Sequence, residues 1–295
     1  MSVYNKSGNA VSAVFGSDGR RLSEAYSYDG TLVYTDATDY DNYTISSMFS
    51  LSGSGFQSFS VHDGIIAQII ANDKIRFVDL TTHEVLVSSV NVSVGHGNSC
   101  QFSQTFLFDG DEFPLLWSTD TYRRVYINHI TRTSSTLLKT YYFDVDLSGY
   151  ILGIGVNEDE NRLYTVGYTY QDYESDRGGV NKVHTSIWDL TQETDNGDGT
   201  YSLARLSTNA IDFFPCIQGS CYHDGFMFVS SGLNGNQARI FLIDPNTGQI
   251  EHTVMIGNTI EMEGCAWVDN DYLIAGQSPA NISYKKIEFE PITEG

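Results

Sequence analysis

A pattern that predicts four strands occurs twice in this sequence. Such a repeat limits the fold to architectures built from repeated four-stranded sheets. The segment "FQSFSVHDGIIAQII" (56–70) aligns with "IQGSCYHDGFMFVSS" (217–231), and both contain a Gln near the start and the triplet His-Asp-Gly. Further along, "IRFVDLTTHEVLVSSV" (75–90) aligns with "IFLIDPNTGQIEHTVM" (240–255). Each copy indicates four strands joined by short turns, which is the plan of one blade of a β-propeller.

Looser copies of the pattern fill the rest of the chain. Blades begin near residues 57, 98, 149, 218 and 263. Four strands per repeat at such spacings are typical of a propeller. The last copy lacks its fourth strand, so we expect "NYTISSMFSLS" (42–52) to pair with the C-terminal strands and close the ring. The sequence therefore predicts a five-bladed propeller over residues 41–295, with six blades as the alternative if the third interval contains another blade.

The residue pattern between these landmarks supports an all-β fold. Apolar residues alternate with polar ones or form short runs between Gly, Asn and Asp clusters, whereas helical periodicity is almost absent. The 19 Tyr and 16 Phe residues suit the half-buried surface of a strand.

Charge and targeting signals exclude several classes of partner. The 16 Lys and Arg against 37 Asp and Glu give a net charge of −21, which repels nucleic-acid phosphates and anionic lipids. We expect no nucleic-acid partner. The N-terminus has no apolar region typical of a signal peptide, and no apolar run is long enough for membrane insertion.

The four cysteines do not form the pattern of a disulfide framework. We interpret them as reduced core residues, with a Cys216–Cys221 bridge as a minor alternative. Together with the missing signal peptide, this predicts a protein that folds in a cytoplasm and can be exported later as part of a larger assembly.

A second, shorter repeat occupies residues 1–40, which we interpret as a separate attachment segment. Gly8, Gly19 and Gly30 lie 11 residues apart, each with an aromatic residue four positions before it and an aliphatic residue three positions after it. Each unit can form a short hairpin or one rung of a β-structure, and such small units need stacking or oligomerisation for stability.

This repeat, in "YNKSGNAV", "FGSDGRRL" and "YSYDGTLV", resembles short N-terminal repeats of tail and receptor-binding proteins from bacteriophages and prophages of gut bacteria. The resemblance covers only the repeat segment. It implies a virion protein whose N-terminal segment contacts other tail proteins, often as a homotrimer, and whose distal domain binds a glycan or protein on the host surface.

The first residues of the innermost strands are the candidate ligand-binding residues, because in a propeller they face the central channel and its mouth. By alignment these residues are Gln57, His96, Asn98, Gln218 and Glu263. A ring of amides with one imidazole and one carboxyl group can donate and accept hydrogen bonds in fixed directions, as sugar hydroxyls require. The alternative is that these groups hydrogen-bond to one another and to channel water, and only hold the blades in register.

The segment "YTYQDYES" adds three aromatic candidates, Tyr168, Tyr170 and Tyr173, whose rings could stack on sugar faces. Ordinary strand and loop packing explains them equally well.

No motif in the sequence predicts a metal or a cofactor. His62 and His223 repeat, but in the turns of two separate blades. The oxygen-rich segments "NEDEN" (157–161) and "DNGDG" (195–199) lack the ligand order of a calcium loop and read as solvated turns.

Three functional hypotheses remain. The favoured one is a non-catalytic module that recognises a surface glycan or protein. The second is a glycoside hydrolase that uses paired carboxyl groups from Glu261, Glu263 and Asp146. The third is a purely structural virion protein. Since no nucleophile elbow, phosphate loop or Cys-His pair is recognisable, binding is favoured over catalysis.

Overall fold

The computed structural model is all-β. It describes residues 24–26, 32–35, 38–53, 55–70, 73–120, 122–143, 150–168, 182–212, 217–232, 238–257, 261–278 and 281–291. Every secondary-structure element among these residues is a strand, as the sequence predicted. The described part of the chain contains no helix that is long and apolar enough to cross a membrane.

The chain divides into two compact units. The larger comprises residues 45–286, and the smaller combines residues 1–44 with residues 287–295. In the smaller unit, β1 (Glu24–Tyr26) and β2 (Leu32–Thr35) form an antiparallel pair at the third 11-residue repeat, which is one of the two forms expected for such a unit. The rings of Tyr40 and Tyr43 contact the edge of Phe289 in the same unit.

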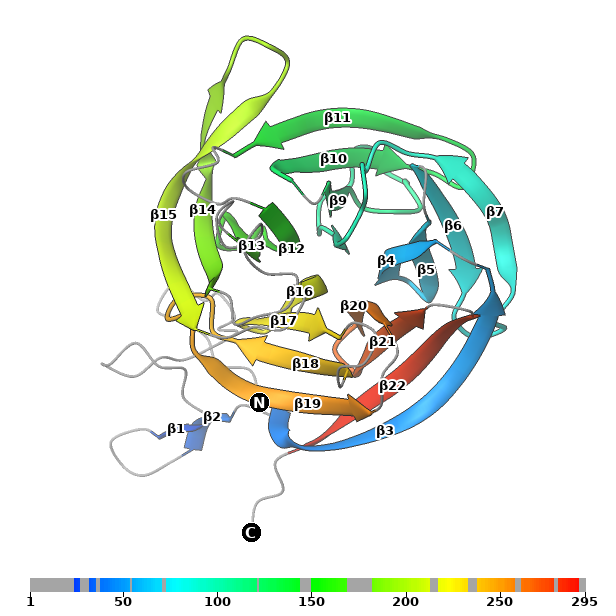
Figure 1. Cartoon of the computed structure of the whole chain (residues 1–295), viewed down its shortest axis with the longest axis vertical. Coiled ribbons are helices and arrows are strands. Elements are labelled where there is room, and N and C mark those ends of the chain that lie inside the picture. Colours follow the sequence, from blue (N-terminus) through cyan, green and yellow to red (C-terminus); the bar gives the residue numbers. More distant parts are fainter. Residues whose placement is uncertain are drawn as a thin grey trace. The chain divides into compact units, whose positions relative to one another are not determined.

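Three four-stranded sheets and one eight-stranded sheet contain the remaining strands (Figure 1). The first four-stranded sheet is β4 (Phe56–His62), β5 (Ile65–Ile70), β6 (Lys74–Asp79) and β7 (Val85–Asn91). The second is β16 (Ile217–His223), β17 (Phe226–Ser231), β18 (Ala238–Ile243) and β19 (Ile250–Gly257). The third is β20 (Glu261–Val268), β21 (Tyr272–Ser278), β22 (Asn281–Pro291) and β3 (Thr38–Ser52), so the predicted pairing of residues 42–52 with the C-terminal strands is confirmed.

The eight-stranded sheet consists of two antiparallel halves. One half is β8 (Cys100–Phe102), β9 (Leu116–Thr119), β10 (Arg124–Ile130) and β11 (Ser135–Tyr142), and the other is β12 (Tyr150–Asn157), β13 (Arg162–Tyr168), β14 (Lys182–Asp195) and β15 (Tyr201–Asp212). A single parallel residue pair, Tyr141 with Tyr201, joins the halves. Lys139 Nζ reinforces this junction, because it lies 2.6 Å from Glu193 Oε2 and 4.8 Å from the centre of the Tyr201 ring.

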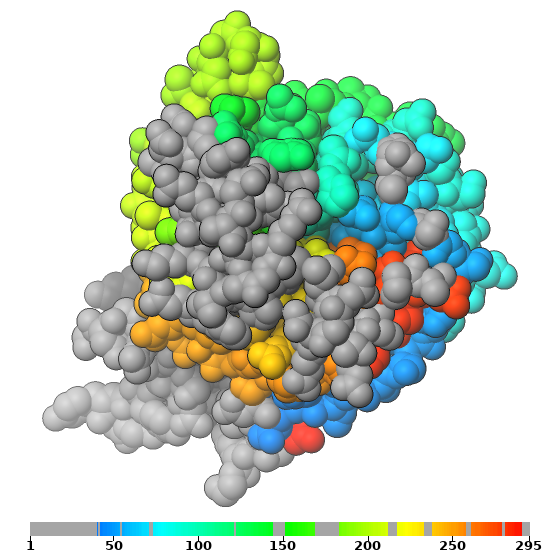
Figure 2. Space-filling model, viewed as in Figure 1, coloured from blue at the N-terminus to red at the C-terminus, as the bar shows by residue number. Residues whose placement is uncertain are grey.

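The sheets of the larger unit are arranged around a common centre, so its fold is propeller-like (Figure 1). We call β4, β8, β12, β16 and β20 the inner strands, because each is the first strand of its sheet or half-sheet and lies nearest the centre. Paired outer strands β14 and β15 extend furthest outward as a hairpin that projects beyond its neighbours (Figures 1 and 2).

Aromatic contacts fill the spaces between neighbouring sheets, and between the halves of the large sheet, and they extend the apolar clusters there. The ring pairs are Phe77–Phe113, Phe143–Trp188, Tyr164–Tyr222, His223–Trp267 and Phe59–Tyr284. Each such pair adds roughly 0.5–1.5 kcal/mol beyond the burial of its area.

Sequence-local turn chemistry explains the hairpins between the first two strands of a sheet. Asp63 and Gly64 both have positive φ, at 45° and 71°, and Asp224 and Gly225 repeat this at 50° and 90°. Two consecutive positive φ values are the requirement of a type I′ turn, for which Asp-Gly is a preferred sequence. The predicted Asp-Gly turns are therefore confirmed.

At the centre, side chains of residues on and beside β8 bind the main chain of two other inner strands. Ser99 Oγ donates a hydrogen bond to Ser220 O (2.9 Å) and accepts one from Ile154 N (3.3 Å). Gln101 Nε2 donates to Val156 O, and Gln101 Oε1 accepts from Val156 N, both at 3.2 Å. These contacts fix the inner strands in register without an intervening layer of large side chains.

The cysteines described here are buried and reduced. Cys100, Cys221 and Cys265 are free thiols, and the Sγ atoms of Cys221 and Cys265 lie 3.9 Å apart, too far for a bond. Cys216, and with it the alternative Cys216–Cys221 bridge, lies outside the described residues.

Gly219 and Gly264 occupy equivalent places in two inner strands and provide a test of this close packing. A Cβ at Gly219 would lie 2.8 Å from Asn98 O and 3.0 Å from Glu263 O, whereas a Cβ at Gly264 would meet its nearest atom at 3.6 Å. We expect Gly219→Ala to lower the free energy of unfolding by about 2 kcal/mol or more and Gly264→Ala to change it by less than about 1 kcal/mol. Urea titration of both variants measures the difference, and equal effects would contradict a hub packed on main-chain atoms.

Candidate functional site

A β-bulge interrupts four of the five inner strands near their first residues. In β4, Phe56 pairs with Ile70 and Ser58 pairs with Ile69, so Gln57 between them has no partner in the ladder. The same irregularity leaves out one residue in each of β12, β16 and β20, namely Leu152, Gln218 and Glu263. A bulge turns the extra residue out of the regular alternation of a strand, and bulges are frequent beside functional sites.

Close packing around Gly219 brings three of the predicted ligand-binding residues together. The carbonyl oxygens of Asn98 and Glu263 both flank Gly219, which follows Gln218 in the chain. Gln218 Nε2 donates a hydrogen bond to Glu261 Oε1 at 3.1 Å. Asn98, Gln218 and Glu263 are each less than one-tenth exposed.

Gln57 lies beside this group, because a Cβ built at Gly264 would be 3.6 Å from Ser58 Cα. The side-chain amide of Gln57 donates a hydrogen bond to Phe56 O, so one of its two N–H groups is already in use. We name the set Gln57, Asn98, Gln218, Glu261 and Glu263 the polar hub cluster.

Glu263 carries the strongest electrostatic signal of the cluster. Burial of its carboxyl group raises the pKa to about 9, and the charge of Glu261 contributes in the same direction. Among the described residues, none hydrogen-bonds to the Glu263 carboxyl group. At neutral pH this side chain is therefore a neutral acid that can donate one hydrogen bond and accept others.

His96 and Asn98 lie on the segment between β7 and β8, which contacts Asp73 and Asp120. Asp73 accepts hydrogen bonds from the main chain on this segment, including one from Val94 N to Oδ1 at 3.3 Å. Gly95, at φ 59°, packs so closely on Asp120 that an added Cβ would lie 2.5 Å from the Asp120 Cβ. His96 itself is exposed, yet partial desolvation of its imidazole lowers the pKa below the usual value.

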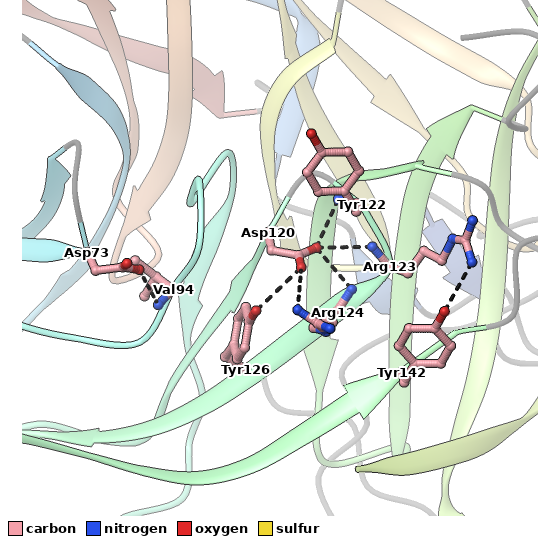
Figure 3. A network of polar contacts seen from close by, with 8 residues as sticks. All are labelled: Asp73, Val94, Asp120, Tyr122, Arg123, Arg124, Tyr126 and Tyr142. Carbon is pink, nitrogen blue, oxygen red and sulfur yellow. Dashed lines mark hydrogen bonds and ion pairs between the residues drawn. The ribbon is translucent and has the colours of Figure 1, made fainter. Parts of the chain in front are cut away.

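Asp120 is buried, and its carboxylate organises the turn between β9 and β10 (Figure 3). Asp120 Oδ1 accepts hydrogen bonds from the main-chain N–H groups of Tyr122 (2.8 Å), Arg123 (3.0 Å) and Arg124 (3.0 Å). The Tyr126 hydroxyl reaches the second oxygen at 3.4 Å. The roles of Asp73 and Asp120 beside the His96 segment could not be predicted from the sequence, although Asp before a tight turn is a recognisable signal.

The polar ring that the sequence predicted is incomplete. Leu152 occupies the bulge position in β12, and it is 4 % exposed within an apolar cluster that includes Val166 and Ile217. The bulge position of β12 therefore contributes to core packing and supplies no hydrogen-bonding side chain.

Of the two interpretations of Tyr168, its surroundings support ordinary packing. Its side chain is 5 % exposed and belongs to the same apolar cluster, and its hydroxyl accepts a hydrogen bond from Ile217 N at 3.3 Å. Tyr168 therefore packs between its own strand, β13, and the inner strand β16. Tyr170 and Tyr173 lie outside the described residues.

The histidines of the two His-Asp-Gly turns pack on aromatic rings. His62 contacts the rings of Phe102 and Phe106, and His223 stacks on Trp267 with the ring centres 4.0 Å apart. The described residues contain no group of three or more His, Cys, Asp or Glu side chains arranged to hold a metal ion.

Comparisons with known proteins give a fold and no family. No protein-family model and no curated protein matches the sequence. A crystal structure of glutaminyl cyclase from Myxococcus xanthus matches the structure with a TM-score of 0.51 and 11 % sequence identity, covering 83 % of this chain and 97 % of that one. Because 879 chains of solved structures match, the likeness is to a widely used architecture, and it shows the fold alone.

The raised pKa of Glu263 predicts a specific dependence of stability on pH. The folded protein holds this proton more tightly than the unfolded chain, so the wild type loses stability as pH rises from about 4.5 to about 9. Glu263→Gln removes this loss, and we expect the variant to gain up to about 3 kcal/mol over the wild type near pH 7 and almost nothing at pH 4.

Chemical unfolding of both proteins at pH 4, 7 and 9 measures this difference, with Glu251→Gln, at an exposed position, as the matched control. A constant difference between Glu263→Gln and wild type at all three pH values would contradict the assignment of a neutral acid.

Proposed function

We propose that the larger unit is a five-bladed propeller, closed by β3. Each of the three four-stranded sheets is then one blade, and each half of the eight-stranded sheet is another. The two halves count separately because, in the described part of the chain, a single residue pair is the only ladder contact between them. Each blade then has its own inner strand. Among the described residues no strand remains for a sixth blade, since β1 and β2 pair only with each other.

We propose that the polar hub cluster binds an uncharged ligand rich in hydroxyl groups, such as a surface glycan, without cleaving it. The observation that carries this proposal is the convergence of the bulged Gln218 and Glu263 with Asn98 around Gly219. Amides and a protonated carboxyl group can each donate and accept, which is what sugar hydroxyls need.

A second function, acid–base catalysis on a glycosidic bond, is favoured by one observation. Glu263 is protonated at neutral pH beside Glu261, and a general acid must hold its proton at the working pH. The hydrolysis of a glycoside requires a second carboxyl group at a suitable distance, for which Glu261 is the candidate. Asp146, the third carboxyl group considered, lies outside the described residues.

Retention on bacterial polysaccharides separates the two functions. We expect the wild type to be retained on an array of such polysaccharides without releasing reducing ends, and Gln218→Ala and Glu263→Ala each to weaken retention by about tenfold or more. The matched control is Gln249→Ala, at an exposed turn position. Release of reducing ends that Glu263→Gln abolishes would establish hydrolysis instead, and no retention of any kind would favour a purely structural protein.

We propose a phage tail as the wider context, with residues 1–40 as an attachment segment that joins the propeller to other virion proteins. The support is the sequence repeat and the antiparallel pairing of β1 with β2. In this arrangement the repeats of three chains would stack, since a single hairpin of this size is only marginally stable in water.

Light scattering can test the attachment segment. We expect the full chain to have the mass of a homotrimer, and a chain that begins at Thr38, which keeps β3 whole, to be a monomer. Equal monomeric masses for both chains would contradict oligomerisation through the repeat, while leaving the proposal for the hub cluster untouched.

A further inference from the structure

The connection between β8 and β9 differs from the corresponding connections of the other sheets. The first two strands are joined by Asp63-Gly64 in one sheet and Asp224-Gly225 in another, whereas residues 103–115 lie between β8 and β9. This long connection follows the end of β8, while Asn98 of the hub cluster precedes its start. We call residues 104–112 the aromatic loop.

Three consecutive large apolar side chains at the tip of the aromatic loop face solvent. Phe106, Leu107 and Phe108 are 42, 38 and 61 % exposed. Together with Asp109 and Asp111 they line an open cavity of about 400 Å³. Single exposed apolar residues are ordinary in proteins, but a contiguous group of them marks an interaction site.

The loop is held in shape by contacts at its base. Phe113 is 1 % exposed and stacks on Phe77 (4.9 Å between ring centres) and on Phe102 (5.8 Å). At the tip, Phe108 N donates a hydrogen bond to Asp111 Oδ2 at 2.8 Å. A surface that is already ordered loses less conformational entropy on binding, which favours affinity.

Carboxyl groups lie on the aromatic loop and beside its first residues. Asp109 is exposed on the loop itself, and Glu158 and Asp159 from the turn after β12 contact its first residues. The nearby cation Arg132 is engaged by Glu112, and His129 lies 3.2 Å from Asp111. The rim is therefore acidic, in a chain whose net charge is −21.

We propose that the aromatic loop is a docking site for a basic segment of another protein, which inserts an apolar side chain beside Phe106 and Phe108 while its Lys or Arg residues face the acidic rim. Charge complementarity selects this occupant over the others. A second copy of this chain would bring another strongly acidic surface, and an anionic membrane would be repelled. The site is independent of the hub cluster, since Phe106 contacts His62, at the end of β4 opposite to Gln57.

A selection experiment tests the proposal with the full chain as bait. A library of random dodecapeptides is selected on the wild type and counter-selected on Phe108→Ser, a substitution at a largely exposed position that leaves the core intact. We expect the enriched peptides to combine an aromatic or aliphatic residue with flanking Lys or Arg. Their fluorescence anisotropy titrations should show about tenfold or greater weakening with Phe108→Ser and with Asp109→Lys.

Matched controls are Leu206→Ser, at an apolar position on β15 that is 47 % exposed, and Glu251→Lys, at an exposed acidic position on β19. Both variants should bind the peptides like the wild type. The affinity of the wild type for the peptides should fall as the salt concentration rises, because salt screens the attraction between charges. The proposal is overturned by a failure to enrich any peptide against Phe108→Ser, or by enriched peptides without basic residues. Two further results would overturn it. One is a dimer of the wild type in light scattering that Phe108→Ser abolishes, and the other is binding of the wild type to phosphatidylcholine vesicles that the same substitution abolishes.

Discussion

The close approach of the inner strands is the constraint on which the rest of the structure depends. Gly219 leaves room for the carbonyl oxygens of Asn98 and Glu263, and Ser99 Oγ bridges the main chains at Ser220 and Ile154. Main-chain atoms of different sheets therefore meet directly at the centre. These contacts fix backbone positions and so hold the side chains of neighbouring residues in place. For the ligand proposed above, such preorganisation would reduce the entropy lost on binding.

Turn chemistry, strand alternation and the covering of a sheet edge could be predicted from the sequence. The Asp63-Gly64 turn, the alternating strands and the pairing of residues 42–52 with the C-terminal strands all follow from local rules or from the need to cover a sheet edge. The role of Tyr168 stayed open between sugar stacking and packing because its environment is not local. Its hydroxyl meets Ile217 N, which belongs to another sheet, and only the assembled fold places that group there.

The hub cluster shows the same division between local and long-range information. Repeat alignment identified Gln57, Gln218 and Glu263 as equivalent positions, and the bulge that they share is consistent with that equivalence. The alignment could not indicate that Leu152 breaks the polar ring. Nor could it indicate that burial raises the pKa of Glu263 to about 9, since desolvation depends on how tightly all inner strands converge.

The two ends of the inner strands differ in chemistry although one acidic chain builds both. At the start of the strands, burial neutralises Glu263 and makes the hub cluster suited to uncharged polar groups. At the other end, the Asp109 carboxyl group is exposed to solvent beside Phe108. The net charge of −21 acts over long distances only where carboxylates stay ionised and solvated. In the functions proposed above, a basic partner would be steered toward the aromatic loop by charge, whereas the hub cluster would select its ligand by hydrogen-bond geometry at short range.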